Sequence, residues 1–380
     1  MRSPNIVINS DVFKWLRESS GWSREDVSRR LNVSVNQVSK WESGEKHPTI
    51  NELKELAKAY KRPLAAFFLP RPEKEPPLPH DFRRLPGGSR PFSKKTLFAI
   101  RRAGNLQAIS GELMENLNQE KGPDISKAGL RESPEKIASE EREKIGLSIE
   151  MQKSWKSYYE AFNSLRELIE RKNILVFQFP AELDELRGFT LMDSEPFVIF
   201  VNSSDIIQAR IFTLLHEYGH VLLNEPSLCI PKEDTVNEKD HDGKVESWCN
   251  RFAGAFLLPK ESVEEAYQKH GVRNLKRIAG QHKTSLLAVL TRLVTLHIIT
   301  QKTYRAEVNK LLSGELAARE SETGGKKGGK GESSAIKALR ERGEPFVSLV
   351  LENSQQGLIT QSRALDYLDV KMKNMKELTS

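Results

Sequence analysis

The stretch His216-Glu217-Tyr218-Gly219-His220, which follows the apolar run Ile211-Phe212-Thr213-Leu214-Leu215, is the part of the chain from which fold and chemistry are most directly predicted. Apolar residues three to four apart predict a helix from about Ser204 to Leu223, capped by Ser203 or Ser204. Residues four apart share one face of a helix, so both imidazoles can reach one ion. Glu217 lies beside them and can accept a proton from a water that the ion polarises. The pattern therefore predicts a metal site on a helix.

A catalytic metal needs a third protein ligand and an open position. Glu246 is a candidate because it lies in a predicted helix, from about Lys244 to Leu258, which Trp248 and Phe252 can anchor in a core. The remaining candidates lie in residues 224–243, a polar segment that we interpret as a loop: Glu225, Glu233, Glu238 and His241. Two imidazoles and a carboxylate suit one Zn²⁺ per chain, and they can also hold Mn²⁺ or Fe²⁺.

Three strand-like runs precede the motif, at Ile174–Phe179, Leu186–Leu191 and Phe197–Val201. With the surrounding helical patterns they predict an α+β domain with a small antiparallel or mixed sheet. If residues 197–202 form an open edge strand, a substrate peptide could add to it. No oxyanion donor is identified, because a structural role suits each nearby side chain better: Tyr218, His241 and His297.

Five short helical patterns fit residues 10–69, and the second and third suit a helix-turn-helix. Val35, Val38 and Trp41 can pack inward on the third pattern. The polar residues on its outer side are candidates for reading bases: Asn36, Gln37, Ser39 and Lys40. Candidate phosphate contacts are Arg24, Lys46 and His47. Periodicity alone leaves a helical protein-interaction domain equally open.

The charge distribution supports an anionic partner for the N-terminal segment. The 380 residues carry a net charge of +7, and residues 1–70 contain 12 Lys and Arg against 8 Asp and Glu. The chain has two cysteines, Cys229 and Cys249, no apolar stretch of membrane-spanning length and no secretory leader. We therefore expect a cytoplasmic protein with reduced thiols and no membrane partner.

Composition changes along the chain predict a multidomain protein. The expected segments are a helix-turn-helix domain at 1–69, a Pro-rich linker at 70–93, a helical connector at 94–150, a peptidase domain at 151–312, a flexible linker at 313–334 and a helical tail at 335–380.

Residues 31–48, with Trp41-Glu42-Ser43-Gly44 and His47-Pro48, resemble the Xre/Cro family of helix-turn-helix repressors. This resemblance covers roughly residues 8–69. It implies an all-α domain of five helices that binds a double-stranded DNA operator, usually as a homodimer.

The motif, followed by Glu246 with Asn250, Phe252-Ala253 and Leu257-Leu258-Pro259, resembles the ImmA/IrrE family of metallopeptidases over about residues 150–300. The resemblance implies a zincin-like fold, His216, His220 and Glu246 as metal ligands, and Glu217 as the catalytic base. Asn224 departs from the pattern, because many members have a histidine there.

The family resemblance further implies cleavage of an Xre-type repressor, which would relieve repression in a stress response or a mobile element. Two alternatives stay open: a DNA-binding regulator whose peptidase-like domain senses a ligand without proteolysis, and an antitoxin-like partner. Residues 272–299 also resemble a helix-turn-helix-like subdomain of the same family, which we interpret as part of the core.

Overall fold

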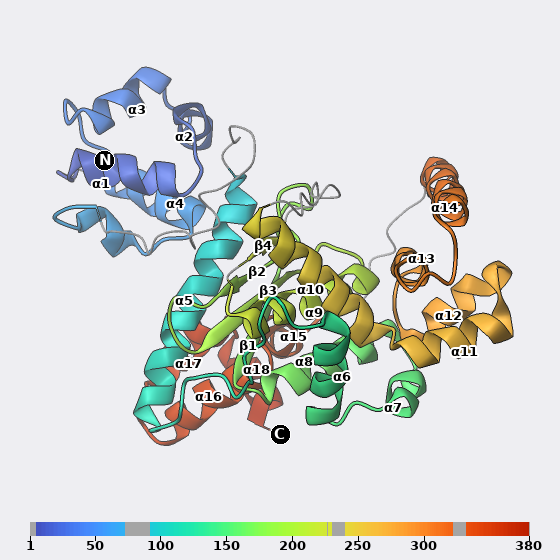
Figure 1. Ribbon diagram of the computed structural model, residues 1–380. Helices are drawn as coiled ribbons and strands as arrows, with labels where there is room; N and C mark the ends of the chain where they lie inside the picture. Colours follow the sequence, from blue (N-terminus) through green and yellow to red (C-terminus); the bar gives the residue numbers. More distant parts are fainter. Residues whose placement is uncertain (1–4, 73–91, 226, 230–239, 322–331, 380) are drawn as a thin grey trace. The chain divides into compact units, whose positions relative to one another are not determined.

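The computed structural model describes residues 5–72, 92–225, 227–229, 240–321 and 332–379 (Figure 1). The chain divides into two compact units, Met1–Gly104 with Pro180–Glu185, and Asn105–Phe179 with Leu186–Ser380. The predicted order is confirmed: a helical N-terminal domain is followed by an α+β domain with a small mixed sheet. The predicted linker at 70–93 lies largely outside the described residues, as do residues 322–331 of the predicted linker at 313–334.

The first unit contains a helical domain whose helices begin at side-chain caps. Its elements are α1 (Ser10–Ser19), α2 (Arg24–Leu31), α3 (Val35–Glu42), α4 (Ile50–Tyr60) and the short 3₁₀ helix η1 (Leu64–Phe68). Side chains of four N-cap residues accept backbone N–H bonds, and these residues are Asn9, Ser23, Ser34 and Thr49. Phe13, Trp41 and Tyr60 are buried at the centre of the domain. Val35, expected to pack inward, is 37% exposed because it occupies the first position of α3.

The next helix, α5 (Lys94–Asn116), belongs in its first half to the same unit as this domain. The Lys94 ammonium lies 2.7 Å from an Asp26 carboxylate oxygen and 4.0 Å from the centre of the Trp22 ring. Arg101 donates to the Ser20 hydroxyl and to the Tyr60 carbonyl. The start of α5 therefore packs against α2 and its preceding turn.

The second unit is built on a four-stranded sheet with the strand order β1-β3-β2-β4. The strands are β1 (Ile174–Phe179), β2 (Gly188–Leu191), β3 (Phe197–Asn202) and β4 (Leu228–Cys229). β3 pairs with β1 in parallel and with β2 in antiparallel orientation. The condition for adding a substrate peptide at residues 197–202, an open edge, is therefore not met. The almost uninterrupted apolar sequence of β3, buried from Val198 onward, is typical of an interior strand.

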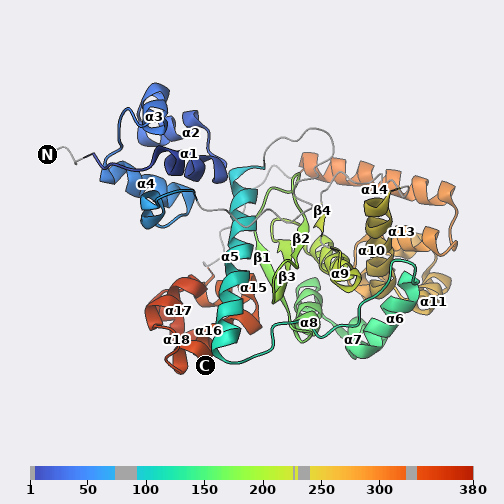
Figure 2. The ribbon, with the colours of Figure 1, turned by 60° about the vertical axis from the view of Figure 1, so that its left-hand side comes forward.

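Helices pack in layers against this sheet (Figure 2). Those that precede or follow its strands are α6 (Pro134–Lys144), α7 (Ile149–Ser154), α8 (Tyr158–Glu170), α9 (Ile207–Leu223) and α10 (His241–Leu257). α9 contacts β2 and β3, and α10 packs on α9. A Cβ added at Gly219 would lie 3.2 Å from the Phe252 ring and 3.3 Å from the Cys249 sulfur, so glycine lets α9 and α10 approach closely.

Two helix starts differ from the sequence expectation. α9 begins at Ile207 with Ile206 as N-cap and no side-chain cap, because Asn202 Oδ1 instead accepts the Ser204 N–H within a turn. α10 begins at His241 rather than near Lys244, because Asp240 caps it through the Gly243 N–H.

The C-terminal half adds helices around this core. They are α11 (Lys260–His270), η3 (Val272–Asn274), α12 (Leu275–His282), α13 (Leu286–Thr295), α14 (Gln301–Ser321), α15 (Ser334–Arg342), α16 (Glu344–Gln355), α17 (Gln361–Leu368) and α18 (Met372–Thr379). α14 extends into the predicted linker at 313–334, because residues 315–319 are strong helix formers. The predicted tail packs against β1, where the Phe346 and Phe177 rings lie 5.8 Å apart. Residues 272–299, interpreted as core, contribute Leu275, Ile278 and Leu290 to the main cluster.

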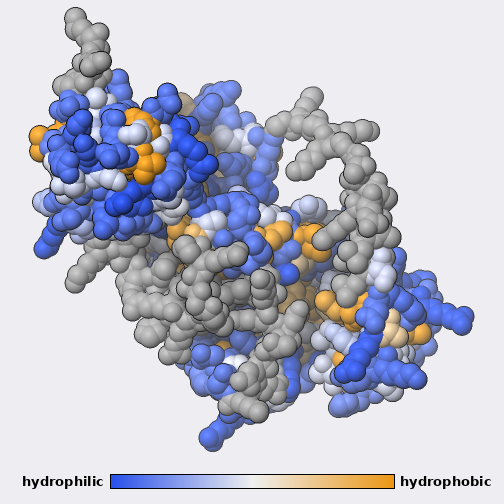
Figure 3. Space-filling model, turned by 90° about the horizontal axis from the view of Figure 1, so that it is seen from above, coloured by the Kyte–Doolittle hydropathy of each residue, from blue (hydrophilic) through white to orange (hydrophobic). Residues whose placement is uncertain are grey.

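Within the described part of the chain, no helix is long and apolar enough to cross a membrane. The coloured surface in Figure 3 is mostly hydrophilic, with smaller hydrophobic areas between the hydrophilic ones.

Candidate metal centre

Three side chains from two helices converge on one point in the second unit. His216 and His220 lie on successive turns of α9, and Glu246 comes from the facing side of α10. The two Nε2 atoms are 3.1 Å apart, and each lies 3.2 Å from one carboxylate oxygen of Glu246. Donors about 2.0–2.1 Å from a tetrahedral zinc ion are about 3.3 Å from one another, so the spacing fits such an ion.

The other nitrogen of each imidazole is held by an oxygen that accepts hydrogen bonds. His216 Nδ1 lies 3.0 Å from the Asn250 side-chain oxygen, and His220 Nδ1 lies 3.2 Å from the Glu225 carbonyl. Both contacts favour the tautomer with the proton on Nδ1, which leaves Nε2 with its lone pair facing Glu246. The two rings are therefore oriented as ligands.

The electrostatics of the cluster favour a cation between the three side chains. Burial opposes a charge on His216, but the neighbouring Glu246 carboxylate raises the imidazole pKa to about 9. Burial likewise opposes ionisation of Glu246, but the two imidazoles hold its pKa well below the usual value. Among the described residues this is the group of His, Cys, Asp and Glu side chains that meets the spacing of a metal site.

Glu217 lies next to this cluster and is completely buried. Its Oε2 accepts a hydrogen bond from the Ser227 hydroxyl, whereas its Oε1 has no hydrogen-bond partner within the described structure. Burial raises the pKa of this carboxyl group, which suits a group that takes up and releases a proton. Sequence reasoning missed Ser227, because a serine ten residues after the glutamate belongs to no recognisable pattern.

Other candidates from the sequence lie away from the convergence point. The Tyr218 hydroxyl donates to Glu141 at 2.6 Å on the core side of α9. The side chains of His241 and Glu225 bind each other at 3.1 Å, and His241 is exposed while Glu225 is partly exposed. His297 is exposed in the turn after α13. Glu233 and Glu238 lie outside the described residues.

Asn224, the departure from the family pattern, is the C-cap of α9. It adopts a left-handed conformation with φ of 55°, which asparagine tolerates better than most residues. The position is exposed, and its backbone ends the motif helix.

On the helical domain, the structure places the predicted base-reading residues on one side of α3. Asn36 is exposed, and Gln37, Ser39 and Lys40 are partly exposed, while Val38 and Trp41 are buried beneath them. The candidate phosphate contacts lie in the segments before and after α3. Lys46 is exposed, His47 is partly exposed, and the Arg24 side chain is 44% exposed. Arg24 also binds Glu42 at 2.7 Å, so an internal ion pair orients its side chain.

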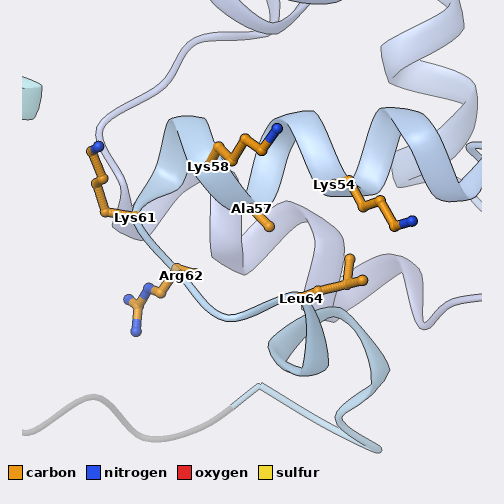
Figure 4. A pocket seen from close by; sticks show the side chains of 6 residues that line it. All are labelled: Lys54, Ala57, Lys58, Lys61, Arg62 and Leu64. Carbon is orange, nitrogen blue, oxygen red and sulfur yellow. The ribbon is translucent and has the colours of Figure 1, made fainter. Parts of the chain in front are cut away.

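The same domain has an open hollow of about 480 Å³ between α4 and η1, shown in Figure 4. Its lining residues are Lys54, Ala57, Lys58, Lys61, Arg62 and Leu64. It contains none of the metal-cluster residues and none of the predicted DNA contacts. The hollow is therefore separate from both.

Comparison with known proteins agrees with the two units. Residues 13–67 match a family model described as a helix-turn-helix, and residues 169–294 match a peptidase family model described as the IrrE N-terminal-like domain. The radiation response metalloprotease IrrE of Deinococcus radiodurans is 31% identical over 101 residues. That alignment covers 26% of this chain and 31% of the relative, so the match spans about a third of the relative's length.

Proposed function

We propose that this chain, in which a helix-turn-helix DNA-binding domain is joined to an IrrE-like metallopeptidase domain, is a zinc-dependent endopeptidase that cleaves a transcriptional repressor. The observation that carries the proposal is the convergence of His216, His220 and Glu246 beside the buried Glu217. The similarity to a metalloprotease of radiation response supports the same reaction class and a role in stress.

His216, His220 and Glu246 would hold a zinc ion, which would supply the Lewis acidity that polarises a peptide carbonyl and makes water a stronger acid. The protein's own contribution is then proton transfer and exclusion of bulk solvent. Glu217 accepts the proton of the attacking water at Oε1 and delivers it to the nitrogen of the departing amine. Its burial keeps bulk water from competing for that proton.

The helix-turn-helix domain supplies the second part of the proposal. Asn36, Gln37, Ser39 and Lys40 on α3 read base edges of a double-stranded operator, and Arg24, Lys46 and His47 contact its phosphates. An operator-bound peptidase meets an Xre-type repressor at high local concentration when both bind the same DNA region. A homodimer would match a palindromic operator. Because the proposed partner is DNA, we expect the protein to act in the cytoplasm.

Cleavage by the purified full chain tests the proposal. The chain is loaded with one zinc equivalent, mixed with candidate Xre-type repressors, and the products are sized by mass spectrometry. We expect a single internal cut that Glu217→Gln abolishes while the bound zinc remains. Cleavage that survives Glu217→Gln would refute the mechanism. Metal-dependent DNA binding without any cleavage would instead indicate a sensor.

A further inference from the structure

The two oxygens of the Glu217 carboxylate have different surroundings. Oε2 accepts a hydrogen bond from the Ser227 hydroxyl, and both residues are buried. Oε1 has no hydrogen-bond partner in the described part of the chain. A carboxylate that rotates freely exchanges the positions of its two oxygens. A single hydrogen-bond donor on one side prevents this exchange and so determines which oxygen remains available to accept a proton.

Strand β2 holds Ser227 in place. The Ser227 N–H donates to the Thr190 hydroxyl at 3.0 Å, and the Thr190 N–H points to the Ser227 carbonyl at 3.4 Å. Thr190 is itself completely buried. Because the backbone of Ser227 is bound on both sides by one residue of the sheet, its hydroxyl has a defined direction toward Glu217.

The same strand leaves room for the other oxygen. A Cβ added at Gly188 would lie 2.9 Å from Glu217 Oε1 and 2.5 Å from the Thr213 methyl carbon. It would also lie 3.0 Å from the Phe200 carbonyl, so a side chain there could not be accommodated without displacing the sheet or the motif helix. β2 therefore influences both oxygens, because Gly188 leaves space beside the free one and Thr190 holds the donor of the bound one.

We propose that Ser227 is a positioning residue for Glu217, whose hydroxyl fixes the carboxylate so that Oε1 alone faces the proton it must accept. This inference rests on the proposed peptidase function. Catalytic carboxylates must be held within a fraction of an ångström of the productive geometry, and a neutral donor to one oxygen achieves this without neutralising the charge. Ser227 acts through Glu217 and does not contact the three metal-binding side chains by any described hydrogen bond.

The test uses acetohydroxamate, a small metal-binding acid that must give its proton to a neighbouring base when it binds. The full chain is loaded with cobalt(II), whose visible absorption reports both metal occupancy and hydroxamate binding. We expect Ser227→Ala to weaken acetohydroxamate about tenfold, which corresponds to the loss of one hydrogen bond to a charged group. Ser227→Thr, which keeps the hydroxyl, should bind within about twofold of the natural chain. Cobalt affinity should be the same in all three proteins.

A double-substitution cycle separates positioning from general damage. In a Glu217→Gln background, which itself weakens acetohydroxamate, Ser227→Ala should have no further effect. Thr190→Val, which removes the acceptor that holds Ser227, should weaken binding in the same direction. It also provides the test if Ser227→Ala does not fold.

The outcomes distinguish this inference from the proposed function. Acetohydroxamate binding that Glu217→Gln weakens but Ser227→Ala leaves unchanged would overturn the inference and leave the peptidase proposal standing. A Ser227→Ala protein that loses cobalt as well as acetohydroxamate would show a merely structural role. Binding unaffected by Glu217→Gln would remove the proposed base itself.

Discussion

Removing Glu246 should convert the site from one that holds zinc tightly to one that holds it weakly. Structural zinc sites bind with roughly 10–16 kcal/mol through four protein ligands, so each ligand accounts for about 2.5–4 kcal/mol. Glu246 contacts both imidazoles at 3.2 Å, and no other described carboxylate meets the spacing of this cluster. Glu246→Ala should therefore weaken zinc binding on the order of 10²–10³-fold.

The assay is a competition between the protein and a chromophoric zinc chelator, read by absorbance. Glu225→Ala is the matched control, because that carboxylate binds His241 and only its backbone carbonyl, which the substitution retains, meets His220. Its zinc affinity should stay within about threefold of the natural chain, by analogy with other surface substitutions.

A Glu246→Ala protein that still binds zinc as tightly as the Glu225→Ala control would refute the three-ligand site. The result would mean that an acidic side chain outside the described residues completes it. Circular dichroism of both variants should match the natural chain, so that lost affinity reflects a lost ligand rather than unfolding.

Three further outcomes are expected. Asn250→Ala removes the acceptor for His216 Nδ1, but water can partly replace this acceptor because Asn250 is exposed. Zinc affinity, measured by chelator competition, should therefore fall only about tenfold. A fall as large as that of Glu246→Ala would contradict this. Gly219→Ala gains helix propensity but places a methyl group within 3.2 Å of the Phe252 ring. The free energy of unfolding, measured with urea, should therefore fall by about 1 kcal/mol. A rise would show that the interface between the two helices has room for the methyl group. Burial lowers the pKa of the neutral His282 to about 4, below its unfolded value, so its contribution to stability is present above pH 6.5 and is lost as pH falls through 4. That loss reaches about 3 kcal/mol, and urea unfolding of His282→Gln between pH 7 and 4 should show a smaller decline than the natural chain.

Much of the local structure was predictable because it depends on short-range geometry. Strand β1 has the predicted bounds, and the Ser23 side chain caps the start of α2 through a backbone N–H three residues on. An error lies where a second local contact competes with the expected cap. Ser203 and Ser204 looked like caps for α9, but Asn202 binds the turn instead and moves the start of the helix.

In the candidate site, too, one part depends on local helix geometry and another part does not. Two imidazoles four residues apart on a helix share a face in any fold, because the backbone hydrogen bonds of the helix set that spacing. The predicted helix around Glu246 favoured it over the acids of the loop segment 224–243 only as a candidate, and the resemblance to a family implied that it is the third ligand.

By itself, then, the sequence determined the helix that carries His216 and His220, the helix-turn-helix pattern at the N-terminus, and the existence of strands before the motif. Only the tertiary structure decided that Glu246 faces the two imidazoles, that β3 lies inside the sheet, and that Ser227 reaches Glu217. The physical reason is the range of the forces involved. Helix periodicity is set by hydrogen bonds between residues four apart, whereas the pairing of α9 with α10 depends on how side chains distant in sequence pack around Gly219.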